Sequence, residues 1–217
     1  RKQHLVMFGE TSPLRDSLPF LDCIFEKAAG VQFGGDFGRG TGAEPLMVPV
    51  PSAKKEVAVI PSICFEDTVP RHPRRFIKNG GQLIVNVTND GWFRESEAAA
   101  QHFANARFRS IELRRPTVRC SNTGVSAVVD QTGRVEDYRS GRRQVLEDAD
   151  GSHFTAGSLL GTVWVPEQGG TTLFARFGDW FGATGAVAGL LLLIGTRVQR
   201  RKTQVEPWEE DVSVEEA

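Results

Sequence analysis

Two apolar runs separated by a charged stretch mark the first half of the chain. Residues 57–64 (VAVIPSIC) and 82–88 (QLIVNVT) are short, apolar and rich in β-branched side chains, so both are predicted to be buried strands. Residues 69–79 between them are charged and run into the glycine pair at 80–81, which is typical of a helix with a glycine stop. A strand, a helix and a strand in this order predict an α/β fold with the two strands parallel.

The second half continues the alternation of helix and strand. Residues 96–113 (SEAAAQHFANARFRSIEL) are rich in alanine, with apolar positions at helical spacing, and predict a long helix that Ser96 caps. Three further strands are predicted, with a turn at 130–133 after the second of them; they lie at 117–120, 125–130 and 158–165. The glycine-rich residues 34–42 lack the Lys-Ser/Thr of a phosphate-binding loop and are expected to form a flexible surface loop.

A segment without charge lies near the C-terminus. Residues 180–196 (WFGATGAVAGLLLLIGT) carry aromatic side chains at one end and are followed by four basic residues within 197–202. A buried core helix is the alternative, but the length, the aromatic end and the cations favour a single membrane span. The positive-inside rule then places 197–202 in the cytoplasm. Residues 206–217 hold six acidic and no basic side chains and are expected to be a solvated tail.

Composition narrows the function classes. The chain has 217 residues with 26 basic and 27 acidic side chains, which excludes a nucleic-acid binder that works by bulk positive charge. Three cysteines exclude a disulfide framework, and Cys23 and Cys120 are expected to be buried thiols. The four histidines lack the spacing of metal ligands, so no metal site is expected. The chain starts at Arg1, and we expect no signal peptide there and expect the chain to be the C-terminal part of a longer protein.

Candidate chemistry gathers at the ends of the two central strands. Cys64 ends the first strand, and residues 89–93 (NDGWF) follow the second, so both are expected at one edge of the sheet, where parallel α/β folds place their sites. A lone cysteine is more often a buried, inert side chain, and a thiol nucleophile needs a base and a cation. Lys2 and Glu10 taken alone are surface charges. His102 is expected to serve in helix packing or hydrogen bonding.

These pieces occur in one order that is specific to a family. The segments RKQHLVMFGE, ICFED, NVTNDGWF, QHFANARFRSIELRRPTVRCSNTGVSAVVDQTGRV and FARFGDWF closely resemble the nitrilase-type domain of the apolipoprotein N-acyltransferase family, from Arg1 to about Arg197. The resemblance implies a partial nitrilase-type α-β-β-α sandwich followed by one transmembrane helix. It divides the chain into a catalytic domain (1–179), the membrane helix (180–196) and a cytoplasmic tail (197–217).

The resemblance also implies roles for single residues. Cys64 matches the nucleophile, Lys2 the residue that stabilises the oxyanion, and Glu10 a glutamate important to activity. Glu66 matches a further glutamate beside the nucleophile. Two aromatic residues match residues that line the substrate site. Phe65 follows Cys64 and stands where a tyrosine is common, and Trp92 lies in the 89–93 loop.

The implied reaction moves an acyl chain from a phospholipid, through a thioester on the cysteine, to the α-amino group of a diacylglyceryl-cysteine on an apolipoprotein. It needs no cofactor or metal and takes place at the bacterial inner membrane, with the catalytic domain on the periplasmic side. The family's general-base glutamate lies upstream of Lys2, so this chain alone is expected to be inactive. A nitrilase-type amidase and a catalytically dead, membrane-tethered remnant are the alternatives.

Overall fold

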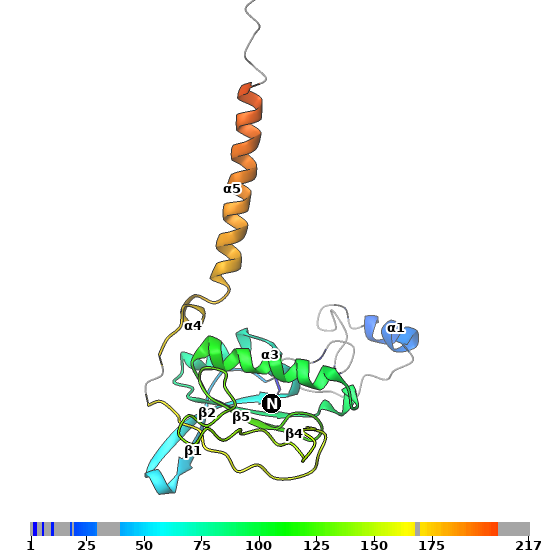
Figure 1. Cartoon of the computed structure of the whole chain (residues 1–217). Coiled ribbons are helices and arrows are strands. Elements are labelled where there is room, and N and C mark those ends of the chain that lie inside the picture. The colour runs from blue at the N-terminus through cyan, green and yellow to red at the C-terminus, as the bar shows by residue number, and fades with distance from the viewer. Residues whose placement is uncertain are drawn as a thin grey trace, which may run out of the picture. The chain divides into compact units, whose positions relative to one another are not determined.

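The structure is a computed structural model that describes residues 2, 3, 6, 10, 18, 20–29, 40–167 and 170–203. Most of the predicted loop at 34–42 and the acidic tail at 206–217 lie outside these residues. The chain divides into two compact units, residues 1–176 and 177–217. The strands and helices, most of them labelled in Figure 1, are α1 (Phe20–Ala29), β1 (Leu46–Val50), β2 (Lys55–Ile63), α2 (Arg71–Ile77), β3 (Leu83–Thr88), α3 (Glu97–Leu113), β4 (Thr117–Ser121), β5 (Ala127–Val129), α4 (Leu173–Phe177) and α5 (Trp180–Thr203).

One sheet organises the first unit. Its five strands lie in the order β1-β2-β3-β4-β5. The pair β2–β3 is parallel, as the order of strand, helix and strand predicts, and β3–β4 is parallel too, whereas β1 and β5 join the edges in antiparallel orientation. The α/β fold class is therefore confirmed. Three short 3-10 helices connect elements: η1 (Pro51–Ala53), η2 (Cys64–Thr68) and η3 (Asp90–Phe93).

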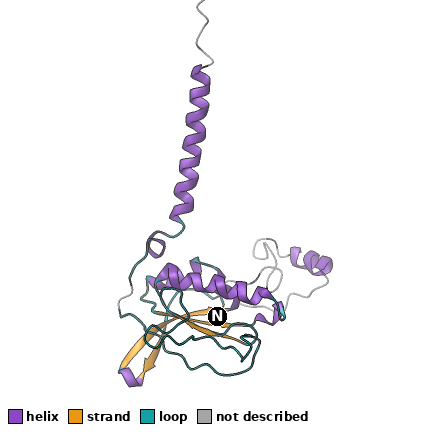
Figure 2. Ribbon diagram, in the orientation of Figure 1, coloured by secondary structure: helices purple, strands orange, loops and turns teal. Residues whose placement is uncertain are grey.

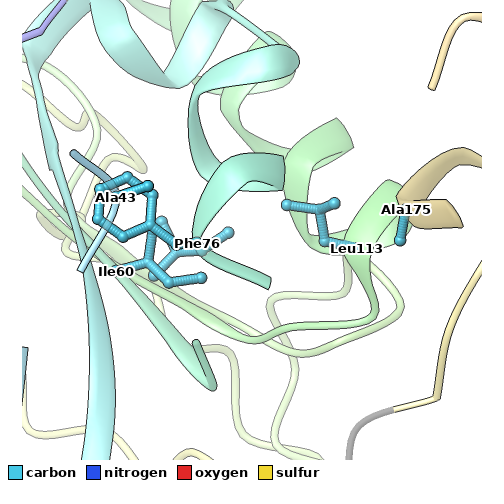
Figure 3. Packing of buried hydrophobic residues seen from close by; sticks show 6 residues of the cluster. Ala43, Ile60, Phe76, Leu113 and Ala175 are labelled. Carbon is cyan, nitrogen blue, oxygen red and sulfur yellow. The ribbon is translucent and has the colours of Figure 1, made fainter. Parts of the chain in front are cut away.

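Helices cover one face of this sheet, and α3 runs across it (Figures 1 and 2). The side chains of Ile60 and Ile84, which pair across β2 and β3, point to that face and are fully buried. They pack with Phe76 of α2 and Leu113 of α3 (Figure 3). Burying such apolar side chains stabilises the fold by about 1.5–3 kcal/mol each, which is why the alternation along the strands fixes their register.

The long helix begins and ends where local chemistry allows. The Ser96 hydroxyl accepts a hydrogen bond from the amide of Ala98 at 3.4 Å, which confirms the predicted cap. The helix ends at Arg114, which adopts a left-handed conformation with φ of 52°. Its amide still donates to the carbonyl of Ser110.

Several local predictions were wrong or incomplete. Residues 158–165 form no strand, and the amide of Thr162 donates to the side chain of Gln144. The edge strand β1 and helices α1 and α4 were not predicted. Cys23 and Cys120 are exposed free thiols, not buried ones.

The second unit contains one long helix, α5, which runs from Trp180 to Thr203 and so continues through the basic residues. Its segment Trp180–Arg200 is long and apolar enough to cross a membrane. Within the unit, its large apolar side chains are exposed; these include Val187, Leu190, Leu191, Leu192, Leu193 and Ile194. A buried core helix, the alternative interpretation of this segment, would hide these side chains in the protein interior.

Candidate active site

Cys64 stands at the carboxyl end of β2, as the first residue of η2. Its φ of 53° lies in the left-handed region, which is uncommon for a residue with a Cβ atom and costs of order 1–3 kcal/mol. The side-chain amide of Asn86 on β3 donates to the carbonyl of Cys64 at 3.3 Å and supports this turn. The thiol lies 4.0 Å from the carbonyl oxygen of Asn89, so β2 and β3 deliver both segments to one edge of the sheet, as expected.

Lys2 and Glu10 form a close ion pair beside the thiol's cavity. The Lys2 ammonium donates to both carboxylate oxygens of Glu10, at 2.7 and 2.6 Å. The amide of Val6 donates to the same carboxylate at 2.9 Å, so Glu10 also closes the turn of its own segment. The Lys2 side chain is only 10% exposed. Two hydrogen bonds to one carboxylate hold the Lys2 ammonium in place, and a fixed donor is what stabilises a developing oxyanion.

Glu66 is fully buried and joins two segments. One carboxylate oxygen accepts from the amide of Ile63 at 2.9 Å, and the other accepts from the amide of Gln3. The imidazole of His72 lies 3.6 Å from it. Glu66 therefore ties the turn that carries the thiol to the residue after Lys2. It lines a separate hollow with Gln3 and His72, so its position suits the support of Lys2 and Cys64 rather than contact with an incoming amine.

A cavity of about 420 Å³ opens on the thiol. Most of its surface is apolar. Phe65 and Trp92 belong to its lining and are 42% and 79% exposed, so they border its mouth. The lining comprises Val6, Glu10, Cys64, Phe65, Thr68, Asn89, Trp92, Phe93, Ala98, Gln101, His102 and Asn105. A site of this size and lining suits an aliphatic chain with a polar head near the thiol.

A group of buried charges lies next to the cavity, and sequence reasoning missed it as a group. Four side chains form this buried charge cluster: Asp67, Asp90, His102 and Arg119. His102 contacts Asp67 and Asp90 at 2.8 Å each, and Arg119 reaches both carboxylates, with 2.9 Å to Asp90. The available signal was the placement of Asp67 and Asp90 just beyond two parallel strands and of Arg119 inside a buried one.

Contacts within the cluster favour the charged forms of His102 and Asp90, although burial opposes them. Desolvation lowers the pKa of His102, but the hydrogen bonds to Asp67 and Asp90 outweigh it and raise that pKa from 6.5 to about 9. Burial likewise raises the pKa of Asp90, yet the bond to His102 and the charge of Arg119 bring it below its usual value. Each of the two carboxylates thus contacts both His102 and Arg119.

The basic side chains at the end of α3 and just after it bond to the protein itself. Arg109 pairs with Glu112 at 2.8 Å. Arg107 instead donates to the carbonyl of Gly133, and Arg115 to backbone carbonyls that include Gly81. Among the described residues, no group of three or more His, Cys, Asp or Glu side chains has the arrangement of a metal site.

Comparison with known proteins points to one family. The family model described as "Carbon-nitrogen hydrolase" matches residues 1–137. The chain is 32% identical over 200 residues to the apolipoprotein N-acyltransferase of Geobacter metallireducens, covering 92% of this chain and 33% of that protein. It is 36% identical to the enzyme of the same name from Bradyrhizobium diazoefficiens, over 92% of this chain and 33% of the relative.

The relative from Nitrosomonas europaea is 35% identical over 94% of this chain and 36% of its own length. The chain therefore spans about a third of the length of these curated relatives. Among solved structures, a carbon-nitrogen hydrolase from Helicobacter pylori G27 aligns with 50% of this chain and 43% of its own, at 15% identity and a TM-score of 0.38.

Proposed function

The chain belongs to the carbon-nitrogen hydrolase family, and on that premise we propose that it serves lipoprotein maturation by N-acyl transfer. The relatives named apolipoprotein N-acyltransferase support this reaction class. The observation that carries the proposal is the largely apolar cavity that opens on Cys64. An amidase acting on small soluble amides has little need for such a cavity.

The first half-reaction forms an acyl-enzyme. The Cys64 thiolate attacks the ester carbonyl of a phospholipid, and the carbonyl oxygen becomes an oxyanion that Lys2 stabilises. As the intermediate collapses, the ester C–O bond breaks, the general base passes the proton it removed from the thiol to the lysophospholipid alkoxide, and a thioester remains. Glu10 holds Lys2 in place through both carboxylate oxygens, and Glu66 ties the thiol turn to the Lys2 segment.

The second half-reaction releases the product. The α-amino group of a diacylglyceryl-cysteine attacks the thioester, a C–N bond forms, the C–S bond breaks and the amine proton returns to the thiolate. Phe65 and Trp92 at the cavity mouth contact the acyl chain in both steps. A covalent intermediate suits this exchange because the two lipid substrates occupy the site in turn.

Both substrates are membrane lipids, which gives the C-terminal segment its role. We assign residues 180–196 to a membrane span, 197–217 to a cytoplasmic tail and 1–179 to the catalytic region on the periplasmic side of the inner membrane. The apolar, exposed side chains of α5 and the basic residues at its end support this arrangement.

The test uses the full-length protein in detergent with a phospholipid and a diacylglyceryl-peptide. Cys64→Ala should abolish N-acylation of the peptide, and the covalent acyl adduct seen by intact mass in the native protein should disappear. Cys120→Ala is the matched control, because this exposed thiol lies outside the cavity lining, and it should keep both signals. N-acylation of the peptide at the native rate in Cys64→Ala would refute the proposal. Hydrolysis of the acyl-enzyme by water, without N-acylation of the peptide, would favour the amidase.

A further inference from the structure

The four members of the buried charge cluster come from four different elements around the thiol: η2, η3, α3 and β4. Asp67 belongs to η2, which begins with Cys64, and Asp90 begins η3, which contains Trp92. His102 lies on α3 and reaches the cavity, and Arg119 lies on β4. The proposed chemistry uses none of the four. Buried charges are costly to desolvate, so their retention beside a site calls for an explanation.

His102 makes the bond that joins the two loops. Its Nε2 lies 2.8 Å from Asp67 Oδ1, and its Nδ1 lies 2.8 Å from Asp90 Oδ1. Both ring nitrogens face carboxylate oxygens, and the imidazolium, which a pKa of about 9 favours, donates to both at once. Nδ1 also lies 3.2 Å from Arg119 Nη2. The cation therefore fixes the distance between the turn that carries Cys64 and the loop that carries Trp92.

Arg119 and Asn86 continue this connection to the thiol's own backbone. Arg119 donates to Asn86 Oδ1 at 3.0 Å, and the amide of Asn86 donates to the carbonyl of Cys64 at 3.3 Å. Arg119 also bonds both carboxylates of the cluster. Two sets of contacts thus stabilise the left-handed conformation of Cys64. Asn86 bonds its carbonyl, and Asp67, in the turn that follows, is bonded by His102 and Arg119.

We propose that His102 is a positioning residue whose two hydrogen bonds hold the Cys64 turn and the Asn89–Phe93 loop in the spacing that acyl transfer requires. This inference rests on the proposed function, because it assumes that the thiol and the cavity act together. Its bond to Asp67 sets the position of the thiol, and its bond to Asp90 sets the wall of the cavity that contains Trp92.

Two conservative substitutions of His102 each remove one of its two hydrogen bonds and keep the other. An asparagine amide reaches the position of Nδ1 and a glutamine amide that of Nε2, so His102→Asn retains the bond to Asp90 and His102→Gln the bond to Asp67. Arg119 donates to both carboxylates and is unchanged in either variant. The Thr88 hydroxyl also donates to Asp90 Oδ1, at 3.0 Å, so Asp90 in His102→Gln keeps one more donor than Asp67 does in His102→Asn. The asparagine variant should therefore affect the thiol more strongly.

The experiment measures the thiol and the reaction independently. In full-length protein with Cys23→Ser and Cys120→Ser as background, alkylation of Cys64 by iodoacetamide is followed by peptide mass spectrometry, and kcat and KM are measured for acyl transfer. His102→Asn should slow alkylation and lower kcat about tenfold or more, because a buried bond on the thiol turn is lost. His102→Gln should alkylate within about threefold of the native rate and raise KM about fivefold or more.

Ser110→Ala is the control, since it removes a buried bond between the same helix and β4, from Ser110 to Thr117 at 2.7 Å, outside the cavity lining. If both His102 variants alkylate and turn over like Ser110→Ala, or if they lose activity only in proportion to a lowered Tm, the positioning role is wrong. Acyl transfer that survives Cys64→Ala would instead refute the proposed function, and the alkylation rates would still decide the role of His102.

Discussion

At the scale of single residues, the candidate site depends on a strained cysteine and a shielded lysine. Cys64 adopts φ of 53° directly after an extended strand, which turns its side chain out of the sheet and toward the cavity. Lys2 is 10% exposed and bonded to both oxygens of Glu10, so little motion is left to its ammonium. Such preorganisation is what gives an oxyanion donor its catalytic effect.

The charge of Lys2 is therefore expected to matter far more than its bulk. Lys2→Met keeps the approximate length of the side chain and removes the ammonium. Loss of one oxyanion donor typically lowers kcat about 100–1,000-fold, and we expect a reduction in that range with a smaller change in KM. Single-turnover formation of the acyl-enzyme measures this step directly.

The matched control is another lysine–glutamate pair on the same chain. Lys55 and Glu167 also form an ion pair, but their side chains are 62% and 77% exposed. An exposed pair contributes about 0–1 kcal/mol, so Lys55→Met should leave kcat and Tm nearly unchanged. An equal loss of kcat in Lys2→Met and Lys55→Met would show that removing any paired lysine lowers activity, and that Lys2 has no specific role in the reaction.

At the scale of elements, the site is a junction of η2, η3 and α3 over the ends of β2 and β3. The buried charge cluster joins these elements, and its members contact one another rather than solvent. An isolated cation here would be unfavourable, but the carboxylates on both sides of His102 compensate for its desolvation. The junction therefore depends on the proton that His102 carries.

That dependence predicts a direction for stability against pH. The charged groups facing His102 are Asp67, Asp90 and Arg119. The two carboxylates outweigh burial and the charge of Arg119 and raise the folded-state pKa of His102 to about 9, above the unfolded value of 6.5. Below pH 6.5 the imidazolium is present in both states and its stabilisation is complete. As the pH rises through about 9, the folded protein loses the proton and this contribution disappears.

Thermal unfolding of native protein and His102→Asn across pH 6 to 10 checks this expectation, with the range chosen to span roughly the two pKa values. The Tm advantage of the native protein should be largest at the acid end and should shrink as the pH passes about 9. An advantage that stays constant or grows with pH would contradict the charged state assigned to His102.

At the scale of the whole molecule, the chain combines an α/β unit with a long apolar helix. The 21 residues from Trp180 to Arg200 span about 31 Å as a helix, close to the thickness of a bilayer core. The exposed leucines at 190–193 are suited to lipid contact. A reaction between two membrane lipids would use such an anchor to keep the cavity near its substrates.

Charges introduced into the middle of this helix test its role. Leu191→Arg combined with Leu192→Arg should release the protein from membranes in alkaline carbonate extraction, because each arginine costs about 2.5–3.5 kcal/mol at the centre of a span. Val198→Arg, beside the existing cations at the helix end, should leave the protein in the membrane pellet. Retention of the double variant would argue against a span at 180–196.

The sequence alone determined the elements whose patterns are local. The parallel pair β2–β3, the capped helix α3 and the apolar segment of α5 follow from periodicity, capping residues and length. The edge strand β1 was missed, and 158–165 was wrongly assigned as a strand, because strand formation depends on a partner that local pattern does not reveal.

The candidate site divides in the same way. The resemblance named Cys64, Lys2 and Glu10, whereas the expected meeting of Cys64 and the 89–93 loop at one edge follows from the parallel strands. Only the tertiary structure joined Asp67, Asp90, His102 and Arg119, which lie up to 52 residues apart and have no common motif. Burial converts them from ordinary surface charges into a fixed group, because without water each charge must find its partner within the protein.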